Sequence, residues 1–544
     1  LAVRLISNQV HSTTLPPLRS GRHNSISMDL IKRLLLLVAC FIVASCGDSK
    51  PFLSAALPFP TPGQHDLVVL TTPGLLSYKT EENNQVTGLE HDLIEAFAQE
   101  LGVAVKYLVV SPEEIESQLT NDKAHFAAAW LSPPENSKIK TTPNIRYTND
   151  VIIQHEASLP VLDIDELKGK TVHVIAGSRQ AKTLLDLQKN VPELLVVEEK
   201  DPDIFKLLER LGERRIRYAV IDSALVDTAT QIIPTLQATL SLKTEQPIVW
   251  LFGEKPNVEL EARANAFVQR VQHDGTLARL DDRYFGHTQR LNQADVVKFL
   301  GEIQTTLPKF RKYFHAAEAL TGIDWRLIAA VAYHESHWDP NATSYTNVRG
   351  IMMLTEETAD RLEVSNRLDA SESILAGARY INLLKDSLPD EVDEPDRTWL
   401  ALAAYNIGPG HFKNARLLAK QLKADPNSWY EMKRVLPKMA QPKFMQQLKI
   451  NRARGGEAVI LVENIRSYYD ILMHNATPFI RNSSASANIQ RLVDEIEQRR
   501  KAYVKNVQAA KSISATEQDD SSNQKLRLPT IDQDTSPTRP AEAG

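Results

Sequence analysis

The pattern of apolar residues changes character near residue 292, and this change constrains the fold more than any other feature. Before it, short apolar runs typical of buried strands (67–70, 103–110) alternate with amphipathic helical segments such as 92–101. After it, helical periodicity dominates to about residue 480. With 544 residues, the chain is long enough for two folded units with flexible ends. We therefore predict a multidomain protein in which an α/β domain with mainly parallel strands precedes a mainly α domain.

The expected boundaries follow from shifts in composition along the chain. We expect an over-extended translation start at 1–27, a signal segment at 28–46, a linker at 47–65, the α/β domain at 66–287, a connector at 288–310, the mainly α domain at 311–480, and a polar helix with a disordered tail at 481–544. The linker is rich in proline and lacks periodicity, and the tail is rich in Ser, Asp, Gln and Pro.

The segment before the linker has the features of an export signal. Lys32 and Arg33 precede an apolar core at 34–43 that is too short to span a bilayer comfortably. The core runs into Val-Ala-Ser-Cys46, which resembles the lipobox of bacterial lipoproteins. That resemblance implies a lipid on Cys46, and Gly47 after it implies the periplasmic side of the outer membrane. An ordinary cleaved signal with an incidental cysteine is the alternative.

Charge and cysteine content exclude several classes of function. The formal net charge is −5, without the basic surplus that binding to nucleic acid usually requires. The two cysteines, Cys40 and Cys46, both lie in or beside the apolar signal core. The folded part therefore has neither a disulfide framework nor a cysteine metal site.

Two segments that bracket the α/β domain resemble family 3 periplasmic solute-binding proteins. Residues 87–102 are similar to the opening helix of that family, and 274–286 to its closing segment. The resemblance implies two lobes around a hinge with a polar ligand between them. Amino-acid binders of the family hold the ligand carboxylate with an arginine, but Asn136 stands at that position here. Asp222 matches the residue that receives the ligand ammonium, although a helix cap is the alternative for an acidic residue at a strand end.

One helical segment of the second domain carries a glutamate on its apolar side. The segment begins near Asp324 and ends before Pro340. An advance of 100° per residue puts Glu335 on the same arc as Trp325, Ile328, Val331 and Ala332, with Arg326 roughly opposite. Burial raises the pKa of a carboxyl group, as a general acid near neutral pH requires. A glutamate that merely reaches solvent at a helix end is the alternative.

Two histidines flank this glutamate without forming a metal site. In the string His334-Glu-Ser-His337, the histidines are one residue too close for the His-Glu-x-x-His pattern of zinc proteases. We therefore predict that the site uses neither a metal nor another cofactor.

Further blocks follow Glu335-Ser336 in a fixed order: Ser344, Gly350-Ile-Met-Met353, Ala404-Tyr-Asn406 and Tyr468. Each block alone is weak, but the ordered set resembles the lytic transglycosylases of the goose-lysozyme-like superfamily. The likeness covers about 170 residues, and Met353 stands in place of the usual glutamine.

The resemblance implies cleavage of the MurNAc-GlcNAc β-1,4 bond of peptidoglycan with formation of 1,6-anhydromuramoyl ends. Glu335 would be the single catalytic acid and base, and the muramoyl N-acetyl group would stabilise the developing cation. Asn406 and Tyr468 would orient that group, Tyr405 and Met353 would shape the cleft, and Ser344 would line it.

Two other functions stay open at this point. A hydrolytic muramidase would use water in place of the internal hydroxyl, and a non-catalytic envelope binding protein would have an inactive helical domain. The expected partners are peptidoglycan glycan strands, the membrane through the lipid, and a peptide or muropeptide that binds the first domain and regulates activity.

Overall fold

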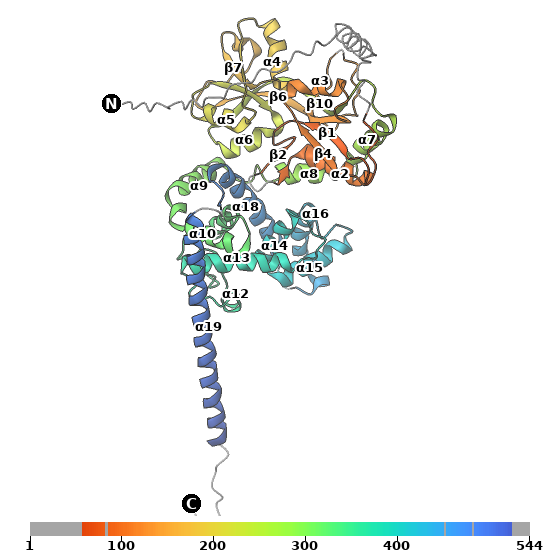
Figure 1. Cartoon of the computed structure of the whole chain (residues 1–544). Helices are drawn as coiled ribbons and strands as arrows, with labels where there is room; N and C mark the ends of the chain where they lie inside the picture. The colour runs from red at the N-terminus through yellow and green to blue at the C-terminus, as the bar shows by residue number, and fades with distance from the viewer. Residues whose placement is uncertain (1–56, 82–84, 136, 451–452, 481–483, 525–544) are drawn as a thin grey trace, which may run out of the picture. The chain divides into compact units, whose positions relative to one another are not determined.

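A computed structural model describes residues 57–81, 85–135, 137–450, 453–480 and 484–524. The predicted signal segment with Cys46 lies outside these ranges, and so does Asn136. Strands and helices alternate up to about residue 287, and the described chain is helical after that (Figure 1). The predicted fold class is therefore confirmed. None of the helices in the described ranges combines the length and the hydropathy needed to span a bilayer.

Eight strands of the first domain form a mixed sheet in the order β4-β1-β5-β10-β6-β9-β7-β8. Their bounds are β1 (Leu67–Thr71), β4 (Val105–Val109), β5 (Phe126–Leu131), β6 (Arg146–His155), β7 (Thr171–Ile175), β8 (Leu195–Glu199), β9 (Tyr218–Asp222) and β10 (Leu236–Phe252). A short hairpin joins β2 (Lys79–Thr80) to β3 (Val86–Thr87).

Strand β10 is long enough to belong to both lobes of the first domain. It pairs with β5 through Val249 to Phe252 and with β6 through Leu236 to Ile248, so it runs from one lobe into the other. Both pairings are antiparallel, as is β6 with β9, whereas β1 with β4, β1 with β5, β7 with β8 and β7 with β9 are parallel, so the sheet holds the predicted parallel strands together with antiparallel ones. The sequence does not distinguish the two because a buried central strand reads as an apolar run in either direction.

The helices of the two lobes cover the sheet. They are α2 (Leu89–Leu101), α3 (Ile115–Thr120), α4 (Arg179–Asn190), α5 (Ile204–Gly212), α6 (Val226–Ile232), α7 (Val258–Val271) and α8 (Thr276–Phe285). Helix α2 buries Leu93, Ile94 and Phe97, as its apolar spacing predicts. It ends at Gly102, whose φ of 70° is the left-handed conformation that glycine adopts without a steric penalty.

The second domain is built from helices around one apolar core. They are α9 (Gln293–Thr305), α10 (Leu307–Thr321), α11 (Trp325–Ser336), α12 (Glu356–Arg361), α13 (Ala370–Asp386), α14 (Asp396–Ile407), α15 (Pro409–Gln421), α16 (Trp429–Val435), α17 (Pro442–Leu448), α18 (Gly455–Asn475) and α19 (Ser484–Gln524). Trp325, Trp338 and Trp429 are buried in this core. Helix α19 packs on the same core through Ile489 and Val493, and it extends beyond the polar helix that the sequence predicts at about 488–511.

Candidate active site

Helix α11 positions Glu335 in its last turn. Asp324 caps the helix by accepting the backbone N–H of Arg326, as the sequence indicates. The helix stops because His337 takes the left-handed conformation and donates its N–H to the carbonyl of Tyr333. Arg326, which we predicted opposite the apolar arc, is itself buried and forms an ion pair with Asp324 at 2.7 Å. The helix is therefore enclosed by protein, and Glu335 emerges only at its end.

The carboxyl group of Glu335 has a strongly altered affinity for protons. Burial among protein atoms raises the pKa of Glu335 from 4.5 to about 8. Among the described residues no side chain forms a hydrogen bond or an ion pair with it, although Glu335 remains partly exposed at the helix end. At neutral pH the group is therefore mostly protonated, which makes it a proton donor.

Side chains from two other elements fix the turn at 350–353 beside Glu335. Ser336 donates its hydroxyl to the carbonyl oxygen of Ile351 at 2.8 Å. Tyr405 of α14 donates to the carbonyl oxygen of Met352 at 2.6 Å. These two hydrogen bonds join three of the blocks that the sequence singled out, so the structure brings Glu335, the 350–353 turn and Tyr405 together.

The same turn requires unusual backbone conformations. Gly350 has a φ of 83°, and a Cβ atom there would lie 1.8 Å from the carbonyl oxygen of Arg367. Met353 has a φ of 46°, which is uncommon for a residue with a side chain. The surrounding contacts therefore hold Met353 in a conformation that it would rarely adopt by itself.

Tyr405 of α14 lies close enough to Glu335 to interact with its charge, and Asn406 follows it on the same helix. Burial raises the pKa of Tyr405 well above its usual value, and the neighbouring charge of Glu335 raises it further. The side-chain oxygen of Asn406 is buried and has no hydrogen-bond partner among the described residues. A buried amide oxygen of this kind is costly unless a ligand supplies a donor.

Tyr468 of α18 packs against Tyr333 of α11, the helix that carries Glu335. Its ring centre lies 4.9 Å from that of Tyr333 and 4.6 Å from that of Phe299, and burial raises the pKa of Tyr468 to about 12.

The structure does not bring Ser344 into this group. Its hydroxyl accepts the backbone N–H of Val348 at 3.1 Å within its own loop, and no contact given by the structure joins it to Glu335.

Two residues of α13 behind the turn were missed by the sequence analysis. Ser373 is fully buried and accepts the backbone N–H of Met352 at 3.3 Å. Gly377 leaves room for Met352, because a Cβ atom there would lie 2.6 Å from the methionine methyl group. The only signal in the sequence is a run of small residues on a helix, which usually means close packing and nothing more.

A second candidate site lies in the first domain, where Asp222 is placed. A cavity of about 640 Å³ is lined by residues that include Asp222, Trp130 and Arg179. Asp222 is buried, and the indole N–H of Trp130 donates to it at 2.7 Å. Neither Trp130 nor Arg179 could be predicted from the sequence, because neither belongs to one of its recognisable motifs.

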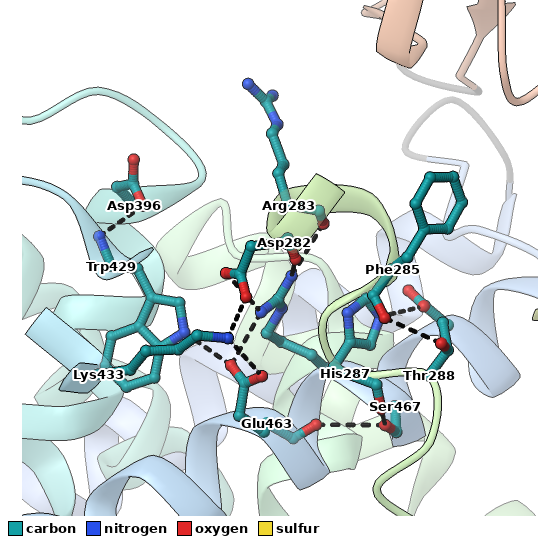
Figure 2. Close-up of polar contacts among 12 residues, drawn as sticks. Asp282, Arg283, Phe285, His287, Thr288, Asp396, Trp429, Lys433, Glu463 and Ser467 are labelled. Atoms are coloured by element: carbon teal, nitrogen blue, oxygen red, sulfur yellow. Dashed lines mark hydrogen bonds and ion pairs between the residues drawn. The ribbon is translucent and has the colours of Figure 1, made fainter. Parts of the chain in front are cut away.

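The last part of the first domain contacts helices α16 and α18 of the second (Figure 2). Arg466 donates to the carbonyl oxygens of Asp282 and Arg283, each at 2.8 Å. Lys433 pairs with Asp282 and lies 3.2 Å from Glu463. Burial would raise the pKa of Glu463, but the charges of Arg466 and Lys433 hold it below its ordinary value. The contact therefore contains a buried network of paired charges.

Each of the two domains matches the model of a known protein family. Residues 67–287 match the family model for bacterial extracellular solute-binding proteins, family 3, and residues 312–427 match the model for the transglycosylase SLT domain. An ancestral arginine-binding protein bound to arginine is 21% identical, with a TM-score of 0.37, and the match covers 40% of this chain and 98% of that one.

Two relatives match most of the chain, and both are named membrane-bound lytic murein transglycosylase F. The one from Methylobacillus flagellatus is 43% identical over 413 residues, which is 75% of this chain and 88% of the relative. The one from Nitrosospira multiformis is 41% identical over 458 residues, which is 83% of this chain and 94% of the relative. Because both likenesses extend over most of this chain and most of each relative, this chain belongs to the membrane-bound lytic murein transglycosylase F family.

Proposed function

We propose that this chain cleaves the MurNAc-GlcNAc β-1,4 bond of peptidoglycan and leaves 1,6-anhydromuramoyl ends. The proposal rests on the burial of the carboxyl group of Glu335, because this burial raises the pKa of Glu335 to about 8. A group with that pKa is protonated before the reaction and can take a proton back after it, so a single carboxylate suffices.

The reaction divides into two proton transfers. In the first, Glu335 donates its proton to the glycosidic oxygen, and the bond from that oxygen to C1 of N-acetylmuramic acid breaks. The muramoyl N-acetyl oxygen stabilises the cation at C1. In the second, the 6-hydroxyl of the same sugar attacks C1 and gives its proton to Glu335, which restores the enzyme.

The neighbouring side chains support this route over one with two carboxylates. The site residues that the other sequence motifs supply, namely Met353, Tyr405, Asn406 and Tyr468, include no second acid, whereas most glycosidases use a pair. The unpartnered oxygen of Asn406 suits the N–H of the muramoyl N-acetyl group, which it would accept in a hydrogen bond.

Mass spectrometry of digested peptidoglycan tests this function. We expect anhydromuropeptides and no new reducing ends, because no water is added. Products heavier by one water would instead indicate a muramidase. A Glu335→Gln protein that still binds glycan but releases nothing would exclude contamination by another enzyme, and activity retained in that variant would contradict the assigned role.

We infer further that a peptide or muropeptide bound by the first domain regulates cleavage. Support comes from helix α18, on which one residue contacts the end of the first domain and the next residue packs beside the candidate active site. Ser467 donates to the carbonyl oxygen of His287 at 2.7 Å, and Tyr468 packs beside the helix that carries Glu335. Asp470 of the same helix lies 2.5 Å from the imidazole Nε2 of His287. A shift of this contact would therefore move Tyr468.

Replacement of one partner in this contact tests the regulation. Asp470→Asn keeps the shape but removes the charge opposite His287, so we expect an altered response of cleavage rate to added muropeptide. Asp494→Asn, on the exposed side of α19, is the matched control and should behave like the unchanged protein. Equal responses in all three proteins would argue against communication through α18.

We also infer that Cys46 anchors the chain by a lipid on the periplasmic side of the outer membrane. Support comes from the short apolar core before Cys46 and from the names of the relatives, which are called membrane-bound. Cys46→Ala should release the protein into the soluble fraction. A variant that still sediments with membranes would contradict a lipid anchor.

A further inference from the structure

The cavity of the first domain contains a buried group of charges that belongs to the protein itself. Asp222 and Asp150 come from neighbouring strands β9 and β6, and both are buried, with exposed fractions of 3% and 0%. Arg179, at the start of α4, reaches both: its guanidinium lies 2.5 Å from Asp222 and 2.6 Å from Asp150. The side chain of Arg179 is 7% exposed and borders the cavity.

The acceptor capacity of Asp222 is fully used inside the protein. One oxygen accepts the indole N–H of Trp130 at 2.7 Å and the guanidinium of Arg179 at 2.5 Å. The other accepts the hydroxyl of Thr148 at 2.5 Å and the backbone N–H of Ala224 at 2.8 Å. A carboxylate has about four lone-pair sites, so none remains for the ammonium group of a ligand.

The positive charge of Arg179 also disfavours a ligand ammonium at this position. The guanidinium already neutralises Asp222, and a further cation beside it would experience repulsion at low dielectric. Asp150 does not replace Asp222 as an acceptor, because one of its oxygens accepts from Thr183 at 2.6 Å and from Gln246 at 2.5 Å, and the other lies 2.6 Å from the guanidinium of Arg179.

We propose that Arg179 fills the ammonium subsite from within, so that this cavity binds peptides whose α-amino group is acylated and excludes free amino acids. The inference rests on the proposed peptide binding of the first domain and specifies its chemistry. A guanidinium only donates hydrogen bonds, and the Nε–H of Arg179 has no partner among the described residues. An acyl carbonyl accepts such a bond, whereas an ammonium cannot.

The dimensions and the lining of the cavity fit a peptide of this kind. A volume of about 640 Å³ lies within the range that holds drug-sized ligands. Leu75, Leu76 and Ile204 give it apolar walls, and Lys200 adds a cation for a ligand carboxylate. The stem peptide of peptidoglycan is acylated at its first residue for as long as it stays attached to muramic acid. The cavity would therefore select peptide still joined to a glycan over peptide that has been released.

Calorimetry on the full chain in detergent tests this selectivity with two matched probes. The probes are the tripeptide L-alanyl-γ-D-glutamyl-L-lysine with its α-amino group either acetylated or free. We expect the acetylated form to bind at least about tenfold more tightly. Arg179→Ala should abolish or reverse that preference, whereas Arg263→Ala, which removes an exposed arginine paired with Glu259 on the same domain, should keep it. Equal or tighter binding of the free amine to the unchanged protein would overturn the proposal.

A second measurement isolates the role of Arg179 from the identity of the ligand. Methylguanidinium should raise the melting temperature of Arg179→Ala by refilling the vacated charge site, and it should not do so for Arg263→Ala. No such shift in a folded Arg179→Ala protein would show that the subsite is not filled by a cation. If Arg179→Ala does not fold, the probe pair on the unchanged protein decides.

Failure of the inference and failure of the proposed function have different signatures. If neither tripeptide binds, peptide binding by the first domain is wrong, and the acyl preference is wrong with it. If the free amine binds best, only the inference is wrong. The proposed cleavage of glycan by Glu335 would stand in both cases, because it rests on residues of the second domain.

Discussion

Two glutamates, one in each domain, have the same proton affinity but different surroundings. Burial raises the pKa of both Glu90 and Glu335 to about 8. Glu90 of α2 is fully buried and accepts the backbone N–H of Trp130. Glu335 has no partner among the described residues and reaches solvent at the end of α11. A raised pKa therefore does not identify a catalytic acid by itself; exposure to solvent is what distinguishes Glu335 from Glu90.

The cavity of the first domain and the candidate active site of the second also differ in whether their polar groups are paired. In the first domain, the charges of Asp222, Asp150 and Arg179 are paired with one another. In the second, Glu335 and the oxygen of Asn406 lack partners within the described chain. A buried polar group without a hydrogen-bond partner raises the free energy of the protein, and a substrate that supplies the partner lowers it again. Charged groups that are already paired instead fix the shape of a cavity and disfavour ligands that would compete for the same pairing.

The sharpest test of this comparison replaces both glutamates by glutamine. Glu335→Gln should lower the rate of glycan cleavage by roughly 10² to 10⁴, the usual contribution of acid-base catalysis. Glu90→Gln should leave the rate within a factor of about two, although its pKa is equally raised, because no substrate reaches it. Release of soluble muropeptides measures both rates. A large loss in Glu90→Gln would mean that the first domain takes part in the chemistry.

A smaller effect is expected for the unpartnered amide. Asn406→Ala removes the acceptor that we assign to the muramoyl N-acetyl group, so kcat/KM should fall by about tenfold, which corresponds to one hydrogen bond. Asn382→Ala is the control, since that side chain pairs with Asp386 on α13, 3.3 Å away, outside the group of site residues. Steady-state kinetics on purified glycan would compare them. Equal values would remove Asn406 from the substrate contact.

The raised pKa values also predict how stability depends on pH. In the folded protein Glu335 holds its proton up to about pH 8, whereas in the unfolded chain it releases the proton near 4.5. The contribution of Glu335 to the stability of the folded protein therefore falls as the pH rises from 4.5 to 8. Glutamine does not titrate, so Glu335→Gln should melt higher by on the order of a few degrees at pH 8 than the unchanged protein does, and by less at pH 5. Thermal unfolding across this range measures the difference, and a constant difference would show that the pKa is not raised.

The smallest effect is expected where the chain departs from the usual motif. Met353→Gln restores the glutamine of related enzymes at the edge of the site, and we expect activity to change by no more than about threefold. Met352→Gln is the contrasting variant, because Met352 is fully buried against Gly377 and an amide there would lack partners. It should lower the melting temperature clearly. Activity and melting curves of both variants would separate a substrate contact from core packing.

Much of the catalytic domain could be predicted because its signals are local. The apolar arc of α11, the cap at Asp324 and the order of the later blocks all depend on residues close together in sequence. Strand β1 (Leu67–Thr71) lies where the apolar run at 67–70 predicted a buried strand. Ser373 was not predicted, since nothing in the sequence says which backbone N–H a buried serine on a neighbouring helix will accept.

The sequence by itself determined the class of each domain, the position of Glu335 on a buried helix and the family to which the chain belongs. Only the tertiary structure decided which charges meet in the first domain. Arg179 and Trp130 lie 43 and 92 residues from Asp222, and sheet order brings all three to one point. Periodicity reports which side of an element is buried, but not what it is buried against. Partners of that kind follow from the packing of strands and helices far apart in the chain, which no local pattern contains.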